Sequence, residues 1–561
     1  MLVAFLATSA QAAKHLTVQA RPLSELVTAT TGPVQPGAGN IDPTITWGGD
    51  ADSYIAEMRG IYAKHSLKMT IRHNDDVVDQ TSRVLRGEQV YFRGTLEMGL
   101  FADEALRKQG LHLVPALVKT TSTGGDCMIV GPNVKNLNDV KKLALQYPGP
   151  HVYYAFKLFK DAGRPIGSPA GPQVVYYPDL TYPPTGDSGT DIKNPVAAFR
   201  DDTNIDATMC ITADSSMIVG AEGRAGARVY TTTKVGSQII YDLVFVRSDY
   251  FETNRNDVER FVAAHLEAGE YVSLLYNDRN SRTNEFIQLS AAMDKDFGMG
   301  PEISGGMIGD CTFTFHEGNY RFVTGDGTTR NLDVITSEMM TLFKPAGLIR
   351  TSWTMARPVW DWVKLAQGLR YTASAGSVAS SPKPPKKQTT ANETDIEKML
   401  ASIVLEPTSD ADAQGRLFTR EIFFDPGEET FDISKYSRQF REIAELLQTY
   451  PNATVSFTGF ADPRGLLENE ERFANHPAKA QFLSRVRQGA KTLTELRGNK
   501  AKEGFLQYCR SASLIIERPE NFFTNGVGYD RPKHPITQSM TAQQRAENRR
   551  VMVEVFDLRI E

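Results

Sequence analysis

The side chains best able to carry redox or metal chemistry in this 561-residue chain are its four cysteines. They are Cys127, Cys210, Cys311 and Cys509. No two of them stand at CxxC spacing, and none has a histidine at the spacing of a metal ligand, so we predict no metal site. Two states stay open for the thiols: a disulfide between two of the first three, or buried free cysteines.

The short motifs that place a nucleophile, a general base or a phosphate-binding loop are also missing. The sequence has no HExxH, no GxSxG and no GxxxxGK[ST]. Gly526-Val-Gly528 is a lone GxG, which by itself is weak support for nucleotide binding. We therefore predict that the protein is not an enzyme and that it needs no cofactor.

Length and composition set the number of domains and exclude one class of partner. A single hydrophobic core stops growing at roughly 250–300 residues, so a chain of this length should fold as at least two domains. The residues are 41% hydrophobic and 23% charged, with a net charge of -5. This balance lacks the excess of Lys and Arg that a phosphate backbone requires, and we expect no nucleic acid partner.

Composition shifts along the chain predict five segments. They are a signal peptide (1–13), a flexible leader (14–42), a first domain (43–370), a linker rich in Pro, Ser and Lys (371–397) and a second domain (398–561). The signal peptide rests on a short apolar run that closes on Ala10-Gln-Ala12, although no positive residue precedes it. A buried N-terminal strand, an uncleaved membrane anchor and a start further upstream are the alternatives.

The first domain alternates strand-like runs with helical patterns, which predicts an α/β fold with largely parallel sheets. Helical patterns cover 85–106 and 137–145, among others. Three phrases follow in order: Gly48-Gly49 before Met58-Arg-Gly-Ile-Tyr62, then Asn194 to Ala207, then Tyr241 to Gly269. In that order they resemble the periplasmic substrate-binding proteins of the nitrate, sulfonate and taurine transporters. The resemblance implies a two-lobed, type II periplasmic binding protein fold.

The same resemblance implies a ligand cleft between the two lobes. The residues it places there are Trp47, Gly49, Asp50, Thr95, Thr121, Gly124 and Ser215. Asp50, Asp126 and Asp214 stand in or beside the loops concerned, and such carboxylates would repel an anion if they faced the cleft. We therefore expect a small polar solute that bears an amine, or no ligand.

The second domain carries four phrases that span most of its length. They are Gly459-Phe-Ala-Asp-Pro-Arg-Gly465, Leu483-Ser-Arg-Val-Arg487, Gly526-Val-Gly-Tyr-Asp-Arg-Pro532 and Asn548-Arg-Arg-Val551. In this order they are similar to the signature of the OmpA-like domains, an α+β fold that binds peptidoglycan. The sequence departs from the signature by about ten extra residues within 468–481, and by Gly489 near the point where the signature has Ala.

The resemblance implies that Asp462 and Arg487 hold the zwitterionic end of diaminopimelate in the peptidoglycan stem peptide. A carboxylate pairs with the ligand's ammonium, while a planar guanidinium makes a bidentate contact with its carboxylate. Thr458, Phe460 and Asn469 are further candidates around this site, and Arg549 could also touch the ligand.

These patterns together predict an exported, non-enzymatic protein of the periplasm or outer cell envelope of a Gram-negative-type bacterium. The second domain would anchor it to peptidoglycan, and the first would bind a small polar solute or an envelope protein. One alternative is a ligandless scaffold in a wall-anchored machine. Another is an enzyme acting on the wall or on a pyrimidine, since the first domain's lobe order also resembles enzymes that make the thiamine pyrimidine. That family has a cysteine-rich iron motif, which this sequence lacks.

Overall fold

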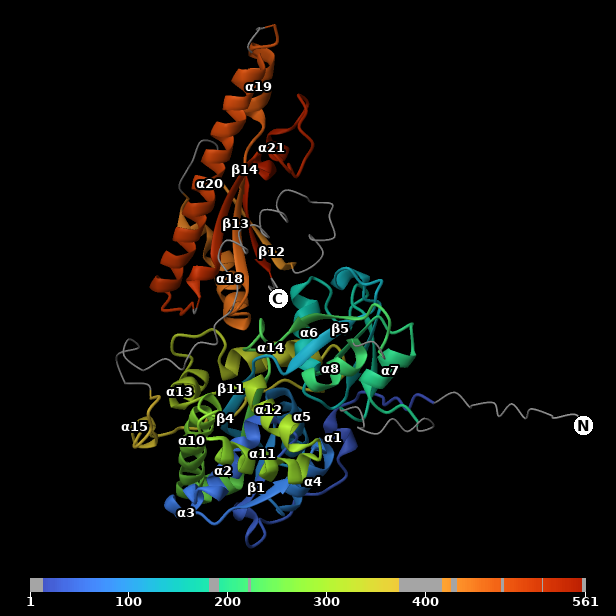
Figure 1. Cartoon of the computed structure of the whole chain (residues 1–561), viewed down its shortest axis with the longest axis vertical. Helices are drawn as coiled ribbons and strands as arrows, with labels where there is room; N and C mark the ends of the chain where they lie inside the picture. Colours follow the sequence, from blue (N-terminus) through green and yellow to red (C-terminus); the bar gives the residue numbers. More distant parts are fainter. Residues whose placement is uncertain are drawn as a thin grey trace, which may run out of the picture. The chain divides into compact units, whose positions relative to one another are not determined.

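The computed structural model describes residues 14–180, 191–219, 223–372, 416–424, 431–475, 479–516 and 518–556. The predicted signal peptide lies outside these ranges, and so does the predicted linker from residue 373 onward. The chain forms two compact units (Figure 1). The first comprises Met1–Thr233, Ile239–His316 and Ile335–Thr372, and the second comprises Lys234–Gln238, Glu317–Val334 and Ala373–Glu561.

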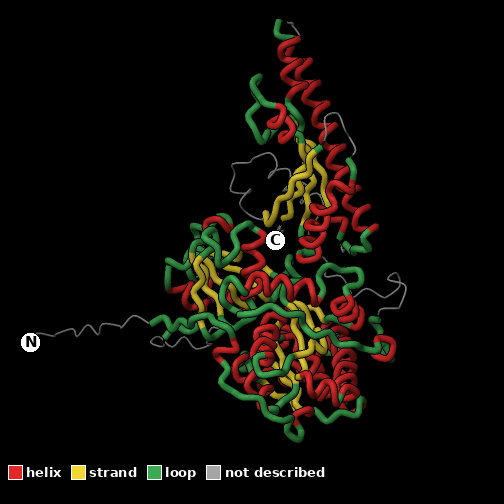
Figure 2. Tube along the Cα trace, turned by 180° about the vertical axis from the view of Figure 1, so that it is seen from behind, coloured by secondary structure: helices red, strands yellow, loops and turns green. Residues whose placement is uncertain are grey.

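The first unit contains three sheets with helices around them, as Figure 2 shows. The strands up to residue 150 are β1 (Ile41–Thr44), β2 (Thr70–His73), β3 (Tyr91–Thr95), β4 (Leu113–Ser122), β5 (Asp126–Val130) and β6 (Lys142–Gln146). The later ones are β7 (Gln173–Tyr177), β8 (Ala207–Ile211), β9 (Arg228–Thr232), β10 (Tyr241–Arg247) and β11 (Cys311–Phe313). The first helices are α1 (Leu23–Leu26), α2 (Ala51–Met58), α3 (Ile61–Lys64), α4 (Val77–Arg86), α5 (Leu96–Arg107) and α6 (Val152–Asp161). They are followed by α7 (Pro195–Asp201), α8 (Thr212–Val219), α9 (Ser248–Thr253), α10 (Arg255–Asn277), α11 (Thr283–Phe297) and α12 (Pro301–Gly306). The last are α13 (His316–Thr324) and α14 (Leu332–Phe343), which both units share, and α15 (Trp362–Leu365).

Two lobes follow from the order of the strands. One sheet has the order β11-β4-β10-β3, and another has the order β7-β6-β8-β5-β9. The chain passes from the first sheet to the second between β4 and β5, and it returns between β9 and β10. The first passage is only three residues long, 123–125, so the ends of β4 and β5 are held close together. We call the part around the first sheet lobe 1 and the part around the second lobe 2.

The sheets correct the prediction of largely parallel pairing. All three pairings in the sheet of lobe 1 are antiparallel, as are those of β5 with β8 and β9. Parallel pairing is found for β1 with β2 and for β6 with β7 and β8. The chain leaves lobe 1 along β4 and returns along β10, and these two strands are antiparallel neighbours in the sheet of lobe 1. In the same way β5 enters lobe 2 and β9 leaves it as antiparallel neighbours, although helices alternate with strands in sequence.

Three local predictions also differ from the structure. The helical pattern 85–106 is the end of α4, the buried strand β3 and all of α5 but its last residue. The pattern 137–145 is a short 3-10 helix, Leu137–Asp139, followed by most of β6. The segment 14–42 was expected to be a flexible leader, yet Leu23 in α1 and Val27 are buried and the Val18 amide donates to the Tyr176 carbonyl. Apolar side chains of this segment are buried, although its Thr, Gly and Pro content predicted a flexible segment.

The second unit is built on one four-stranded sheet of order β12-β15-β13-β14. Its strands are β12 (Arg416–Phe423), β13 (Thr454–Phe460), β14 (Phe522–Gly528) and β15 (Arg550–Phe556). Its helices are α18 (Ser437–Thr449), α19 (Arg464–Arg472), α20 (Lys479–Ser511) and α21 (Ala542–Asn548). The pair β13 and β14 is parallel, whereas β15 runs antiparallel to both β12 and β13.

The core of the second unit lies between the sheet and two helices. Phe440 and Ile443 of α18 and Phe505 of α20 pack with Val455 and Phe457 of β13. The amphipathic face of α18 therefore covers the sheet together with α20, as its apolar stripe predicts. This arrangement leaves the ends of β13 and β14 free to carry the turns that hold the motif residues.

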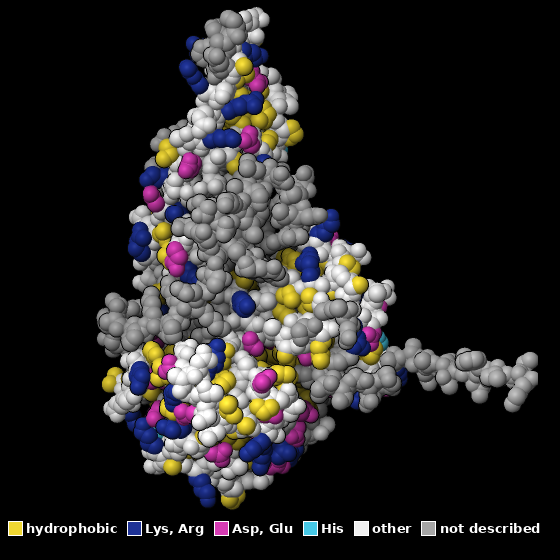
Figure 3. Space-filling view, in the orientation of Figure 1, with side chains coloured by type: hydrophobic (Ala, Val, Ile, Leu, Met, Phe, Trp, Pro, Cys, Tyr) yellow, Lys and Arg dark blue, Asp and Glu magenta, His cyan; other side chains and the backbone are white. Residues whose placement is uncertain are grey.

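The surface of the described residues carries both signs of charge. On the face shown in Figure 3, Lys and Arg side chains are interspersed with Asp and Glu. No helix among the described residues has the length and apolar character needed to cross a membrane.

Candidate functional site

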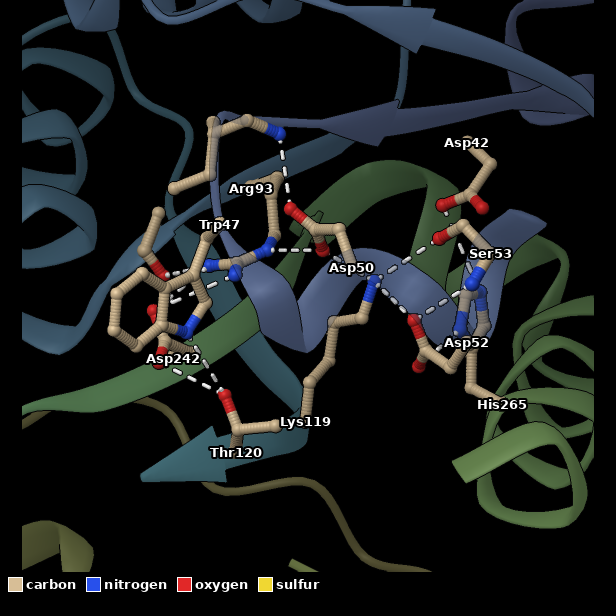
Figure 4. A network of polar contacts seen from close by, with 12 residues as sticks. Asp42, Trp47, Asp50, Asp52, Ser53, Arg93, Lys119, Thr120, Asp242 and His265 are labelled. Carbon is tan, nitrogen blue, oxygen red and sulfur yellow. Dashed lines mark hydrogen bonds and ion pairs between the residues drawn. The ribbon is translucent and has the colours of Figure 1, made fainter. Parts of the chain in front are cut away.

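A network of charged side chains is buried in lobe 1 at the start of α2 (Figure 4). Lys119 at the end of β4 is its centre, and the Lys119 Nζ lies 2.5 Å from Asp50 Oδ1 and 2.8 Å from Asp52 Oδ1. Arg93 of β3 also pairs with Asp50, with Nε 2.8 Å from Oδ1. On the other side His265 of α10 contacts Asp52, with Nδ1 2.9 Å from Oδ2. These five side chains come from five elements, since Asp50 lies in the 3-10 helix Gly48–Asp50 that precedes α2, and all are buried.

Two more carboxylates complete this network. Asp42 lies beside His265 and accepts a hydrogen bond from the Tyr62 hydroxyl. Asp242 of β10 lies 3.4 Å from the Arg93 guanidinium and accepts a hydrogen bond from the Thr120 hydroxyl at 2.9 Å. Four carboxylates thus face three cationic side chains.

Two groups of the network, His265 and Asp242, have raised pKa values. Burial opposes the charge of His265, but Asp42 and Asp52 outweigh it and raise the pKa of His265 to about 9. Burial also raises the pKa of Asp242 to about 6, because Arg93 offsets only part of the desolvation. The network therefore holds His265 as a cation at neutral pH, and Asp242 is the carboxylate that takes up a proton most readily.

Trp47, which the sequence placed in the cleft, fills space beside this network. Its side chain is 5% exposed, and its indole N-H donates to the Thr120 hydroxyl at 3.3 Å. A Cβ atom at Gly49 would lie 2.4 Å from the Thr120 Oγ1, and one at Gly125 would lie 2.3 Å from the Trp47 ring. The two glycines are therefore needed for the close packing of this loop rather than for contact with a ligand.

The remaining predicted cleft residues lie around the passage from β4 to β5. Thr95 caps α5, with its hydroxyl 3.4 Å from the Met98 amide. Thr121 is in β4 and pairs with Tyr241, and Ser215 donates to the Thr212 carbonyl within α8. Gly124 has φ +133°, a conformation that favours glycine, and its amide donates to the Thr233 hydroxyl at 2.9 Å. The structure brings these residues to the junction of the lobes, where their contacts are with the protein itself.

The argument against anions fails in the structure. Asp50 is fully buried between Arg93 and Lys119, so it presents no free charge to a ligand. Asp126 is 2% exposed, and its Oδ1 lies 2.6 Å from the His151 Nε2. Asp214 is 4% exposed within α8. Buried carboxylates acquire partners, which the sequence alone does not reveal.

Two buried polar atoms at the same junction have no hydrogen-bond partner among the described residues. One is Glu97 Oε2 in the first turn of α5, and the other is His151 Nδ1 at the N-terminus of α6. The two lobes are in contact at Glu97, because the Tyr153 amide of α6 donates to Glu97 Oε1 at 3.4 Å. Burial, reinforced by the nearby Asp126 carboxylate, raises the pKa of Glu97 well above its ordinary value. Burial therefore favours the neutral form of Glu97, whose O-H can donate.

In the second unit, Asp462 lies in the turn after β13. Its Oδ1 accepts the Arg464 amide at 3.0 Å, which satisfies a free N-H group at the start of α19. Its Oδ2 accepts from Arg549 Nη1 at 2.8 Å. Tyr529, which follows β14, is also close: burial and the charge of Asp462 raise the pKa of the Tyr529 hydroxyl. The Asp462 side chain keeps 21% of its surface exposed.

The partner predicted for Asp462 in ligand binding, Arg487, lies on α20 and is 58% exposed. Its guanidinium is 4.0 Å from the Glu470 carboxylate of α19. This long and exposed contact contributes little to stability, so the side chain is available to a ligand.

The other residues predicted around this site have structural contacts. Thr458 is buried in β13 with its hydroxyl 2.9 Å from that of Ser456, which corrects its prediction as a rim residue. Phe460 is 2% exposed beneath the Arg550 guanidinium. Asn469 donates to the Gly465 carbonyl at 2.7 Å within α19. Because β13 is buried along its whole length, the side chains that the motif brings near the turn are buried as well.

The sequence analysis missed Lys119, His265, Glu97, His151 and Tyr529. A signal existed for two of them: Lys119 directly follows the apolar run 113–118, and His265 lies on the apolar face of an amphipathic helix. Such positions mark charged groups that must find partners in the core. Glu97 and His151 have no comparable signal, because only the fold brings them together. Among the described residues, no group of three or more His, Cys, Asp or Glu side chains is arranged to hold a metal ion.

Comparisons with known proteins give similarities of fold for roughly half of the chain. No family model matches the sequence, and a search of curated proteins finds no match. Among solved structures, the chain is similar to the periplasmic aliphatic sulphonate binding protein SsuA from Escherichia coli, with 16% identity and a TM-score of 0.40 over 56% of this chain and 94% of that one. It is also similar to the alkanesulfonate-binding protein SsuA from Xanthomonas axonopodis pv. citri bound to MOPS, with 11% identity and a TM-score of 0.39 over 57% and 96% of the two chains. For the periplasmic nitrate-binding protein NrtA from Synechocystis the values are 13% identity and a TM-score of 0.33 over 49% and 69%.

Proposed function

We propose that this protein is a non-enzymatic protein of the bacterial envelope that binds peptidoglycan through its second unit. One observation carries the proposal: three of the four motif phrases meet at Asp462. The turn after β13 supplies Asp462 itself, the end of β14 supplies Tyr529, and the residue before β15 supplies Arg549. These phrases are separated by up to 87 residues in sequence.

The geometry suggests how the ligand is held. The ammonium of diaminopimelate approaches the exposed edge of the Asp462 carboxylate, which the ion pair with Arg549 holds in position. Arg487 leaves Glu470 and makes a bidentate contact with the ligand's carboxylate. Each group then pairs with the ligand charge that it attracts, and neither covalent chemistry nor a metal is required.

Binding to purified sacculi tests this proposal. Asp462→Asn keeps the shape of the turn and the contact with the Arg464 amide but removes the charge. Loss of one partner in such a pair costs about 2–5 kcal/mol, roughly thirtyfold or more in affinity. Arg487→Ala should have an effect of similar size. Arg485→Ala is the matched control, since Arg485 is an exposed arginine of the same helix that is offset by about 200° around its axis.

Equal retention of wild type, Asp462→Asn and Arg487→Ala on sacculi would refute peptidoglycan binding at this site. The second unit would then have to be assigned to docking with another envelope protein. Retention of only the Arg485→Ala variant and the wild type is the expected pattern.

A second candidate function belongs to the first unit, which we propose binds a small polar solute between its lobes. The observation that favours it is the pair of unpartnered buried atoms, Glu97 Oε2 and His151 Nδ1. A buried polar group left without a partner costs about 1–3 kcal/mol, so a ligand oxygen that accepts from Glu97 would recover this free energy. Glu97 belongs to α5 of lobe 1, and His151 lies at the start of α6 in lobe 2. A ligand that contacts both groups would therefore hold the two lobes together.

Thermal unfolding of the full chain in the presence of small amino acids, amines and carboxylates tests the second function. All four tryptophans, Trp47, Trp353, Trp360 and Trp362, lie in the first unit, so their fluorescence reports its melting alone. A solute that binds only the folded state raises the melting temperature of the wild type. The increase should disappear in Glu97→Leu. If no solute at millimolar concentration raises the melting temperature, a ligandless scaffold is the better account of the first unit.

A further inference from the structure

Cys127 and Cys210 lie directly opposite each other in the sheet of lobe 2. Cys127 is in β5 and Cys210 is in β8, and the register of this antiparallel pair matches the two residues. Their Sγ atoms are 3.5 Å apart, and the side chains are 1% and 0% exposed. The 83 residues that separate them in sequence make this contact a product of the fold.

The backbone around the two cysteines suits a covalent bond. The Thr212 amide donates to the Gly125 carbonyl at 2.7 Å, and the Gly131 amide donates to the Asp206 carbonyl at 2.8 Å. In an antiparallel sheet, opposite residues alternate between hydrogen-bonded and non-hydrogen-bonded pairs. Both contacts lie an even number of residues from the two cysteines, so Cys127 and Cys210 are also a hydrogen-bonded pair, with Cα atoms about 5.5 Å apart. Disulfides span Cα distances of roughly 4.4–6.8 Å, with a mode near 5.5–6 Å. The Cβ atoms of a hydrogen-bonded pair lie toward the upper end of about 4.5–5.5 Å, farther apart than in a disulfide, so the bond requires side-chain rotation together with a small approach of the two strands.

The other two cysteines have different surroundings. Cys311 is in β11, in the sheet of lobe 1, with its thiol directed at the Ile308 carbonyl. Cys509 lies in α20 in the aromatic core of the second unit. Both are buried, which makes them internal references for any measurement of thiols.

We propose that Cys127 and Cys210 form a disulfide in the mature protein. The proposal rests on the envelope location proposed above, because disulfides persist in oxidising compartments. The thiolate of one cysteine attacks a disulfide of an oxidant, either a protein disulfide or oxidised glutathione, and forms a mixed disulfide. The second thiolate displaces the oxidant, which leaves as a dithiol or as two thiols, while the two cysteines lose two electrons and two protons.

The bond forms while lobe 2 is still folding. In the folded unit the Cys127 thiol and burial raise the pKa of Cys210 well above its ordinary value, so the reactive thiolate is scarce there. Once formed, the bond ties β5 to β8 two residues from Gly125, whose carbonyl accepts from Thr212. The bond thereby fixes the start of β5, where the chain arrives from lobe 1.

Mass spectrometry after trypsin digestion without reductant tests the proposal on the full-length protein. The chain is first unfolded in guanidinium with iodoacetamide. Trypsin then releases Cys127 in the peptide 120–135 and Cys210 in the peptide 201–224. We expect these two peptides as one linked species, lighter by two hydrogens than their sum, with alkylation of Cys311 and Cys509 only. Refolding of reduced protein with oxidised glutathione should give the same species.

Alkylation of all four cysteines after refolding with oxidised glutathione would overturn the proposal. A bond that forms on refolding but is absent from protein recovered from the native cells would overturn the bond in the mature protein and leave the envelope location to its own test. Peptidoglycan binding is measured separately on sacculi, so its failure would not be confused with either result.

Variants provide a second measurement. Reduction of the wild type should lower the melting temperature of the first unit by about 5–10 °C, because the bond closes a long loop in the unfolded chain. The double variant Cys127→Ala, Cys210→Ala should lose this sensitivity to reductant. Cys311→Ala removes a thiol of similar burial and should keep it. A wild type that melts at the same temperature with and without reductant would count against the bond.

Discussion

Asp462 and Arg549 form an ion pair of 2.8 Å that connects the turn after β13 to the residue before β15. Arg549 also donates from Nε to the Phe424 carbonyl at 2.7 Å, at the end of β12. One guanidinium thus joins three parts of the second unit, and it fixes the carboxylate that we assign to ligand binding. Arg549 is accordingly a positioning residue in the proposed site.

The contacts of Arg549 predict its role in stability. Arg549→Gln removes the charge and should lower the free energy of unfolding of the second unit by about 1–3 kcal/mol, because Asp462 and the Phe424 carbonyl lose a partner. Labelling of the buried Cys509 thiol across a urea series measures this change. Arg438→Gln is the control: that side chain is 89% exposed and should contribute less than about 1 kcal/mol. Equal midpoints for both variants would show that Arg549 is not a structural link.

Arg487 should require its planar guanidinium, not only its charge. Arg487→Lys keeps a cation on α20 but cannot make a bidentate contact with a carboxylate. We expect an affinity for soluble muropeptides about tenfold weaker than that of the wild type, between the wild type and Arg487→Ala. Isothermal titration calorimetry measures it, with Arg485→Lys as the control. If lysine at 487 binds as tightly as arginine, a simple point charge is enough at this position.

Lys119 should be essential to the first unit. Lys119→Met fills a similar volume but leaves Asp50 and Asp52 buried without their shared cation. Breaking a buried ion pair in this way costs about 3–5 kcal/mol. Tryptophan fluorescence in urea measures the change. Lys64→Met, whose side chain is 64% exposed beside Glu267, should change the midpoint little. Similar losses of stability in the two variants would mean that the buried network contributes no more to stability than an exposed ion pair.

The stability of the first unit should fall as pH rises from about 6.5 to about 9. His265 has its ordinary pKa of 6.5 in the unfolded chain and a pKa of about 9 in the folded unit. Its contribution is therefore complete below pH 6.5 and is lost as pH rises through the folded pKa, a loss of up to about 3 kcal/mol. Urea midpoints from tryptophan fluorescence at several pH values measure this slope. His265→Gln should be less stable than the wild type at pH 6.5 and should show a flatter profile, and an unchanged slope would assign it to another group.

The sequence predicted the gross architecture better than the pairing of its strands. An α/β first region and a second unit with a strand, a helix and a turn at Asp462 follow from periodicity and motifs. The antiparallel pairing of the strands that connect the lobes could not be predicted in this way. It depends on the paths of residues 123–125 and of the segment after β9, which decide the strands that become neighbours in each sheet. The strand β3 was missed because it is buried along its whole length between two helices and shows no alternation.

Prediction of the sites has the same limit. Asp462 and Arg487 could be proposed as site residues because each belongs to a phrase of fixed local spacing. Asp50 was also singled out, but its role was misjudged because its partner Lys119 is 69 residues away in sequence. A carboxylate in a loop looks like part of a ligand site until the cation that neutralises it is located.

The protonated His265 has a calorimetric consequence. Near pH 8 the imidazole is mostly neutral in the unfolded chain and mostly charged in the folded unit, so folding takes up close to one proton from the solvent. The buffer must release that proton, and its heat of ionisation becomes part of the measured heat. Scanning calorimetry in phosphate and in Tris at the same pH should therefore give different enthalpies for the first unit, and the difference divided by that of the two buffers counts the protons.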